Sequence, residues 1–310
     1  MRILLTGASS FTGLWFARAL NEAGHHVVAA LRRAREDYAG SGRGLRVARL
    51  AEVAECVFGL SFGDESFLDL CRSGPWDLLC HHAAEVGDYR SAEFDVGRAV
   101  SANTRNFATA VRGMRGVSGV VLTGSVFEAG EGTGTKPLGA FSPYAVSKGA
   151  TAGIVQRQCQ ALDVPLGKFV IPNPFGPYEE PRFCAYLMRQ WREGRVAEVR
   201  TPAYVRDNIH VDLLAQAYAA FAAAVPRGPG FARRNPSGYV GTQGAFAERF
   251  AAAIARRSEW DCALVMREQT EFPEPAVRVN TEPVEIPGWS EERAWDAIAS
   301  FYETAPAHAA

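Results

Sequence analysis

Thr6-Gly7-Ala8-Ser9-Ser10-Phe11-Thr12-Gly13 is the stretch of sequence that decides the fold. It follows a short apolar run from Arg2 to Thr6 and leads into an amphipathic helical pattern from Phe11 to Glu22. A glycine-rich turn between a first strand and a first helix is typical of a dinucleotide-binding site. Gly7 permits the tight turn, and Gly13 lets the helix pack closely on the strand, so the helix N-terminus can face a pyrophosphate. The stretch therefore predicts a Rossmann-type cofactor turn.

The central position of this turn departs from the usual pattern. A glycine there would let the backbone approach the pyrophosphate closely, whereas Ser10 adds a Cβ atom and a hydroxyl group able to bind phosphate. We therefore expect Ser10 to alter the detailed geometry of the turn but not its role. The residues expected to contact the cofactor here are Gly7, Ser9, Ser10, Phe11, Thr12 and Gly13.

The end of the second expected strand indicates the type of cofactor. An acidic side chain at this point would accept hydrogen bonds from the ribose of NAD. The sequence instead reads Leu31-Arg32-Arg33, without a carboxylate. A guanidinium group binds phosphate in a bidentate manner, so Arg32 suits a 2′-phosphate. We expect NADP(H), with NAD(H) as the alternative.

Short apolar runs alternate with helical patterns through the first half of the chain, which predicts an α/β fold with a doubly wound parallel sheet of about six or seven strands. Past Ile171 the composition shifts to proline and glycine. We expect residues 1–171 to form an NADP(H)-binding Rossmann domain, to which 205–225 returns. Residues 172–204 and 226–310 are expected to form a smaller C-terminal substrate-binding domain. The expected strands after the first are Val27 to Leu31, Cys56 to Phe58, Asp77 to His81, Val117 to Thr123 and Leu166 to Ile171.

The composition narrows the class of protein. A chain of 310 residues with 47% hydrophobic residues can bury a large core, and its net charge of −1 gives no basic footprint for nucleic acid or an anionic membrane. The six cysteines are widely spaced and indicate core thiols. The apolar run directly after Met1 leaves no room for a signal peptide, and no run is long enough to span a bilayer. We expect a cytoplasmic protein with a small-molecule ligand.

A tyrosine and a lysine are placed for acid-base chemistry. Ser142 is a natural helix N-cap and Pro143 fits the first turn, so Tyr144 and Lys148 lie four apart on one helical face. A phenol ionises near pH 10 in water, and a neighbouring ammonium favours the phenolate form needed for proton transfer. The run Val117 to Leu122 ends in Thr123-Gly124-Ser125, which puts hydroxyl groups at the ligand-binding edge of a parallel sheet.

Together these motifs resemble the extended short-chain dehydrogenase/reductases, which include the nucleotide-sugar epimerases, dehydratases and 4-ketoreductases. The resemblance covers nearly the whole chain and is most specific over Arg206-Asp207-Asn208-Ile209-His210-Val211-Asp212. It implies that Thr123 is the catalytic hydroxyl, with Ser125 as the second choice. The cofactor-binding residues that it adds are Asp64 at the adenine, Ala83, Ala84, Asn103 and Lys148 at the ribose. The substrate-binding residues that it implies are Glu85, Asn173, Arg206 at the diphosphate, and His210.

Two departures from the family pattern are informative. Dehydratases of the family carry Asp-Glu directly after the active-site hydroxyl residue, where this chain has Gly124 and Ser125, so a 4,6-dehydratase is disfavoured. The arginine often found before the Asn173 segment is replaced by Val170. We expect the phosphate contacts there to differ.

Parts of the sequence also fit a serine hydrolase, a metal site or a non-catalytic binding protein. Gly59-Leu60-Ser61-Phe62-Gly63 fits the nucleophile elbow of a serine hydrolase, although the segment already forms the turn before Asp64. The adjacent pairs His25-His26 and His81-His82 point to opposite faces of a strand and cannot chelate one metal ion, so no metal site is expected. A non-catalytic NADP-binding protein has no need of a proton relay.

The sequence thus predicts an NADP(H)-dependent oxidoreductase acting on a nucleoside-diphosphate sugar. The expected reaction is reduction of a 4-keto group, in which Tyr144 passes the proton, Lys148 lowers the phenol pKa and Thr123 polarises the oxygen. A nucleotide-sugar 4-epimerase is the alternative. The resemblance also suggests a homodimer formed through the helices that carry Asn103 and Tyr144.

Overall fold

The computed structural model describes residues 1–87, 91–136, 138–227 and 230–304. Within these residues the main sheet has seven parallel strands in the order β10-β6-β5-β4-β1-β2-β3. The order reverses between β1 and β4, which is the point where open α/β sheets bind ligands. The strands are β1 (Arg2–Thr6), β2 (His26–Leu31), β3 (Glu55–Phe58), β4 (Leu78–His81), β5 (Val120–Ser125), β6 (Leu166–Ile171) and β10 (Phe231–Arg234).

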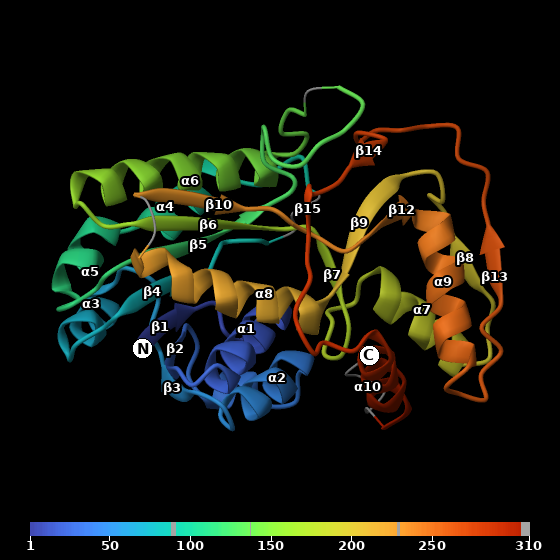
Figure 1. Cartoon of the computed structure of the whole chain (residues 1–310), viewed down its shortest axis with the longest axis horizontal. Coiled ribbons are helices and arrows are strands. Elements are labelled where there is room, and N and C mark those ends of the chain that lie inside the picture. The colour runs from blue at the N-terminus through green and yellow to red at the C-terminus, as the bar shows by residue number, and fades with distance from the viewer. Residues whose placement is uncertain (88–90, 137, 228–229, 305–310) are drawn as a thin grey trace.

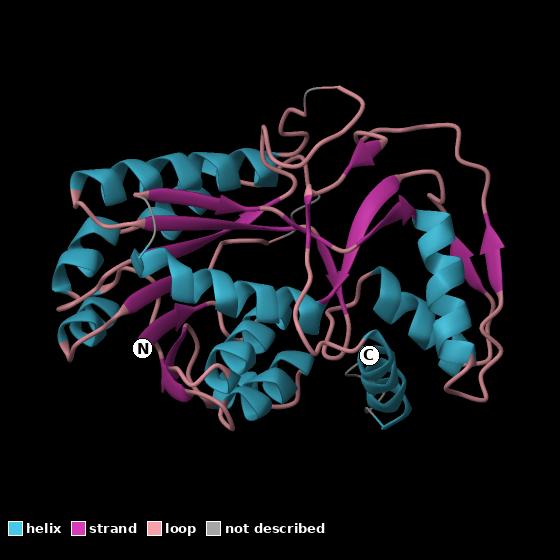
Figure 2. Cartoon of the chain, viewed as in Figure 1, coloured by secondary structure: helices cyan, strands magenta, loops and turns pink. Residues whose placement is uncertain are grey.

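Helices cover both faces of this sheet (Figures 1 and 2). The helices on one face are α1 (Phe11–Glu22), α2 (Gly42–Leu50) and α8 (Val211–Ala224). Those on the other face are α3 (Glu65–Arg72), α4 (Val96–Thr104), α5 (Phe107–Gly113) and α6 (Pro143–Ala161). The buried strands are apolar on both sides because each side packs against helices.

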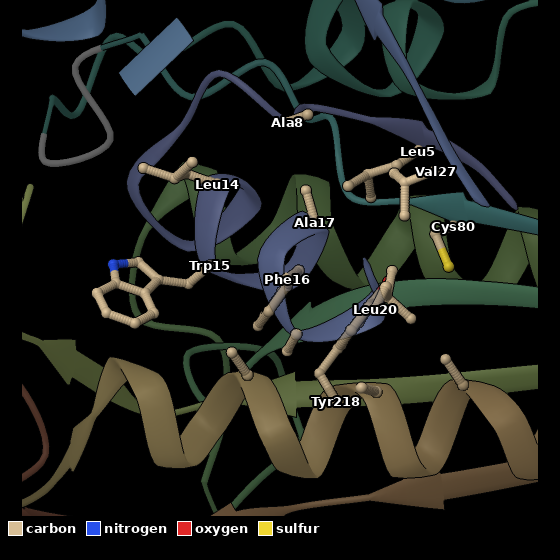
Figure 3. Packing of buried hydrophobic residues seen from close by; sticks show 14 of the residues in the cluster. Leu5, Ala8, Leu14, Trp15, Phe16, Ala17, Leu20, Val27, Cys80 and Tyr218 are labelled. Carbon is tan, nitrogen blue, oxygen red and sulfur yellow. The ribbon is translucent and has the colours of Figure 1, made fainter. Parts of the chain in front are cut away.

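Packing between α1 and α8 holds the first helix on the sheet. Phe16 of α1 stacks on Tyr218 of α8, with ring centroids 3.9 Å apart and nearly parallel planes. Figure 3 shows Phe16 and Leu20 directed toward Tyr218, while Leu5 and Val27 come from the sheet. Because this contact fixes α1 at its centre, the N-terminus of the helix has a defined place above the end of β1.

A smaller part of the chain lies beside the carboxyl ends of the main strands (Figure 1). Its aromatic core includes Phe175, Trp191, Phe250 and Trp295, all of which are buried. Its strands are β7 (Asn173–Phe175), β8 (Ala197–Val199), β9 (Val205–His210), β11 (Pro236–Ser237), β12 (Tyr239–Thr242), β13 (Leu264–Met266), β14 (Val277–Arg278) and β15 (Glu282–Pro283). Its helices are α7 (Phe183–Arg192), α9 (Gln243–Ala255) and α10 (Glu291–Thr304). Two short 3-10 helices, Glu36–Tyr38 and Val225–Arg227, lie beside α2 and α8 of the larger part.

The expected α/β fold with a parallel doubly wound sheet is confirmed. Strands begin and end within a few residues of the expected positions, although the strand expected over Val117 to Thr123 runs from Val120 to Ser125. The segment 205–225 is shared between the two parts of the chain. Its helix α8 packs on α1 of the larger part, whereas its strand β9 belongs to the smaller sheet. Phe231–Arg234 lies in the range expected for the substrate domain but pairs with β6 and forms an edge strand of the main sheet.

Candidate functional site

A cleft of about 640 Å³ opens at the carboxyl ends of the central strands. Its volume lies within the range of small-molecule sites. It joins the turn after β1 to the ends of β4 and β5 and to the first turns of α6. The cleft therefore brings together the glycine-rich turn and the tyrosine-lysine pair, which are far apart in the sequence.

The glycine-rich turn has the geometry expected of a phosphate-binding loop. Gly7 has φ +73°, and a Cβ atom there would lie 2.7 Å from the backbone nitrogen of Ala83. A Cβ atom on Gly13 would lie 2.3 Å from the carbonyl oxygen of Gly7. Both glycines are thus required for the turn to close and for α1 to approach β1. The hydroxyl of Ser10 accepts from the Gly13 N–H at 3.1 Å and donates to the Gly7 carbonyl at 2.9 Å, so it acts as the N-cap of α1.

Three arginines gather beyond the end of β2. Arg32, Arg33 and Arg43 all line the cleft, beside the buried ring of Tyr38. Nη1 of Arg32 lies 3.2 Å from the Glu85 carboxylate. Among the described residues, the guanidinium groups of Arg33 and Arg43 make no ion pair. Positive charge is therefore in excess near the end of β2, which is where Rossmann folds contact the ribose of a dinucleotide. Arg43 was missed by sequence reasoning because α2 reads as an ordinary surface helix.

Asp64 lies close to the cleft but does not line it. Its carboxylate accepts from the backbone N–H groups of Ser61 at 3.1 Å and Phe67 at 3.0 Å, so it caps α3. Leu60, Ser61 and Phe62 line the cleft in its place. Contact between Asp64 and adenine stays a prediction. Ser61 belongs to the segment that fits a nucleophile elbow, and its backbone N–H and carbonyl both bond to Asp64.

The tyrosine-lysine pair is placed on α6 as the sequence predicts. Ser142 caps the helix, with its hydroxyl 3.2 Å from the Ala145 nitrogen. Tyr144 and Lys148 both line the cleft, and the Tyr144 ring meets Phe94 edge-on at 5.9 Å. Nζ of Lys148 donates to the Thr123 carbonyl at 2.6 Å. Burial lowers the pKa of Lys148 from its ordinary value, because the charged ammonium loses solvent.

The two candidate hydroxyl groups on β5 lie in different places. Thr123 lines the cleft, and its Oγ1 is 3.0 Å from Nδ1 of His82. Ser125 does not line the cleft, and its hydroxyl accepts from the Phe127 N–H at 3.2 Å. Of the two, Thr123 has the geometry to meet a ligand.

Asn103 holds the loop after β4. Its Oδ1 accepts from the Glu85 N–H at 2.8 Å, and its Nδ2 donates to the Thr151 hydroxyl of α6 at 3.3 Å. Asn103, Ala83, Ala84 and Glu85 all line the cleft. The amide of Asn103 thus joins α4, α6 and the loop that borders the cleft.

Three residues expected to bind substrate lie outside the lining of the cleft. Nδ2 of Asn173 donates to the Asp207 carbonyl at 3.1 Å. Arg206 donates to backbone carbonyls and pairs with Glu274 at 3.1 Å. Nδ1 of His210 accepts from the Asp212 N–H, so this histidine caps α8. Their roles with substrate stay predictions.

A buried ionic cluster lies beside β5 and was not expected from the sequence. Nζ of Lys168 is 2.5 Å from the Glu128 carboxylate and 2.8 Å from the Glu131 carboxylate. The Lys168 chain passes over Gly124, where a Cβ atom would lie 2.8 Å from Cε. A larger residue in place of Gly124 would therefore displace Lys168.

The described residues show how the cysteines and the possible metal ligands are arranged. All six cysteines are free thiols. Across residues 1–87, 91–136, 138–227 and 230–304, no group of three or more histidine, cysteine or acidic side chains is arranged to hold a metal ion. No helix in those ranges is both long and apolar enough to cross a membrane.

One protein family matches most of the chain. The family model described as the NAD dependent epimerase/dehydratase family matches residues 3–231. No curated protein matches the chain.

Several solved structures share the fold. A UDP-glucuronic acid 4-epimerase from Bacillus cereus, in complex with UDP-glucuronic acid and NAD, has a TM-score of 0.74 at 15% identity, covering 98% of this chain and 99% of the other. A UDP-glucose 4-epimerase from Thermus thermophilus, in complex with NAD, has a TM-score of 0.73 at 18% identity, with coverage of 99% and 100%. A dTDP-glucose 4,6-dehydratase from Bacillus anthracis, also with NAD, has a TM-score of 0.73 at 16% identity, with coverage of 98% and 96%. At such identities the likeness establishes the fold.

Proposed function

The chain belongs to the NAD dependent epimerase/dehydratase family, and from that premise we propose that it is an NADP(H)-dependent oxidoreductase acting on C4 of a nucleoside-diphosphate sugar. The reaction proposed first is reduction of a 4-keto group. The observation that carries the cofactor preference is the group of Arg32, Arg33 and Arg43 at the end of β2. Guanidinium groups bind phosphate oxygens in a fork geometry, and a 2′-phosphate is the feature that separates NADP from NAD.

The residues of the cleft fit a dinucleotide. The tight turn at Gly7 and the close approach at Gly13 leave the N-terminus of α1 open for an anion. No acidic side chain lies in its first turn. When bound, the nicotinamide supplies the hydride for reduction.

The proton is handled by residues of α6 and β5. Tyr144 donates its phenolic proton to the sugar oxygen, and the buried ammonium of Lys148 stabilises the phenolate that remains. Lys148 is held in place by the Thr123 carbonyl. Thr123 contacts the same sugar oxygen through its hydroxyl.

The experiment compares the two cofactors on one class of substrate. Purified protein is mixed with a nucleoside diphosphate-4-keto sugar and either NADPH or NADH. Oxidation of the reduced cofactor is followed by its absorbance. NADPH consumption with formation of the 4-hydroxy sugar is expected. Arg43→Ala is expected to raise the KM for NADPH with little change for NADH. Arg35→Ala is the matched control, because the Arg35 guanidinium stacks on Phe58 and lies outside the cleft lining. Equal use of both cofactors would contradict the proposed preference.

A 4-epimerase is the second candidate, favoured by the family model that the chain matches. An epimerase must keep its cofactor through the reaction, because the hydride returns to the opposite face of the sugar. Protein purified with tightly bound NAD, which interconverts two epimers without consuming cofactor, would decide for this candidate.

A further inference from the structure

The ring of His82 lies between two parts of the cleft, the glycine-rich turn with the start of α1 and the strand β5. Its Nδ1 is 3.0 Å from the Thr123 hydroxyl on β5. Its Nε2 is 3.0 Å from the hydroxyls of both Ser10 and Thr12, in the glycine-rich turn and the first turn of α1. Phe16 packs edge-on against the ring at 5.0 Å. The adjacent His81 makes separate hydrogen bonds, to the Thr6 hydroxyl and to the Asn103 carbonyl.

The neighbours of the ring decide which nitrogen carries hydrogen. Burial, with Lys148 nearby, lowers the pKa of His82 to about 3, so the ring is neutral and has one N–H. Ser10 donates its own hydrogen to the Gly7 carbonyl, so it meets Nε2 as an acceptor. Nε2 therefore carries the hydrogen, and Nδ1 accepts from the Thr123 hydroxyl.

These assignments give one directed chain of hydrogen bonds. Thr123 donates to Nδ1, and Nε2–H donates to the Thr12 and Ser10 oxygens. Thr12 lines the cleft and keeps its own hydrogen for an incoming oxygen. An anion at the N-terminus of α1 would accept that hydrogen and strengthen each earlier bond, because hydrogen bonds in a chain polarise one another.

We propose that His82 is a positioning residue that couples the phosphate-binding turn to Thr123 and makes the Thr123 hydroxyl a hydrogen-bond acceptor toward the sugar. Because Thr123 gives its hydrogen to Nδ1, its free lone pairs receive the O–H group of the alcohol form of the substrate. In this arrangement Thr123 does not polarise a ketone, which is the role expected for it from the sequence, and that task falls to Tyr144. This inference rests on the proposed oxidoreductase function, whichever direction the reaction takes.

The tautomer can be measured without a substrate. ¹⁵N shifts of the His82 ring, assigned by comparison with His82→Gln, distinguish a protonated from an unprotonated nitrogen. We expect the Nε2–H form in the free protein and with NADPH added. An Nδ1–H form would overturn the proposal even if the proposed function holds, whereas this readout is unaffected if the substrate class is wrong.

Coupling through the ring is tested by a mutant cycle. Thr12 and Thr123 are joined through His82, so the effect of Thr123→Val on kcat should depend on whether Thr12→Val is present. In a His82→Leu background this dependence should vanish. His82→Leu itself should lower kcat about tenfold, the kinetic equivalent of one neutral hydrogen bond.

Two further variants separate positioning from folding. His82→Gln, whose amide can both donate and accept, should recover part of the loss in kcat. His26→Gln, an exposed change on β2, is the control for histidine substitution. Independent effects of Thr12→Val and Thr123→Val in the presence of His82, or a His82→Leu enzyme with unchanged kcat, would refute the coupling.

Discussion

Gly124→Ala should destabilise the protein, although alanine usually stabilises a position whose φ it can adopt. Gly124 lies on the catalytic strand between Thr123 and Ser125. Its new Cβ atom would lie 2.8 Å from Cε of Lys168 and 3.1 Å from a carboxylate oxygen of Glu128. A flexible lysine chain would normally move aside. Here it is held by two buried carboxylates, at 2.5 and 2.8 Å.

The magnitude follows from what must move. Overpacking a filled interior costs about 1–3 kcal/mol. Displacing Lys168 would instead weaken a buried ion pair, and breaking such a pair costs about 3–5 kcal/mol. Reduced flexibility of the unfolded chain offsets about 0.4–1 kcal/mol. We expect a net loss of about 2–4 kcal/mol in the free energy of unfolding, which lowers Tm by roughly 5–10 °C in a chain of this size.

Urea unfolding followed by tryptophan fluorescence measures the change. Gly153→Ala is the matched control, because a Cβ atom at this position of α6 meets nothing within 4 Å. It should stabilise the protein by about 0.5–1 kcal/mol through helix propensity. If the clash is the cause, Gly124→Ala and Lys168→Met together cost less than the sum of the two single changes. A Gly124→Ala protein as stable as Gly153→Ala would refute this reasoning.

Three other changes have defined outcomes. Tyr144→Phe should abolish turnover while NADPH affinity, measured by fluorescence titration, stays near the wild-type value; a largely active variant would exclude the proton role. Arg32→Ala should weaken NADPH binding about tenfold to a hundredfold, the loss of a charge-assisted contact, and leave NADH binding nearly unchanged; equal weakening of both would argue against a 2′-phosphate contact. Burial raises the pKa of Glu179 to about 8 from an ordinary 4.5. The folded state then keeps a proton that the unfolded state releases, so stability should fall as pH rises from about 5 to about 8. Glu179→Gln should remove that fall in Tm, and an unchanged pH profile would show that another group causes it.

Features set within one element followed from the sequence alone. The strand, turn and helix around Gly7 could be predicted because a tight turn and a close helix require glycine at fixed spacing. The Ser142 cap and the placement of Tyr144 and Lys148 on one face followed from helical geometry. Each of these depends on neighbours within a few residues.

Features that depend on which elements meet could not be predicted. The bridge from Thr12 through His82 to Thr123 joins the first turn of α1, the residue after β4, and β5, and nothing in the local sequence places them together. The sequence did not show that the Asp64 carboxylate accepts from the N–H groups of Ser61 and Phe67, and its expected contact with adenine stays a prediction.

The partners of charged side chains could not be predicted for the same reason. The sequence did not show that the Arg206 guanidinium group bonds to backbone carbonyl oxygens and to Glu274, and its expected contact with a diphosphate stays a prediction. Lys168 reads from the sequence as one polar residue in a buried strand, and its two carboxylate partners come from the loop after β5. A sequence motif determines which donors and acceptors a residue carries. Only the tertiary structure decides which partner each one finds, because a buried polar group bonds to whatever the fold brings within about 3 Å.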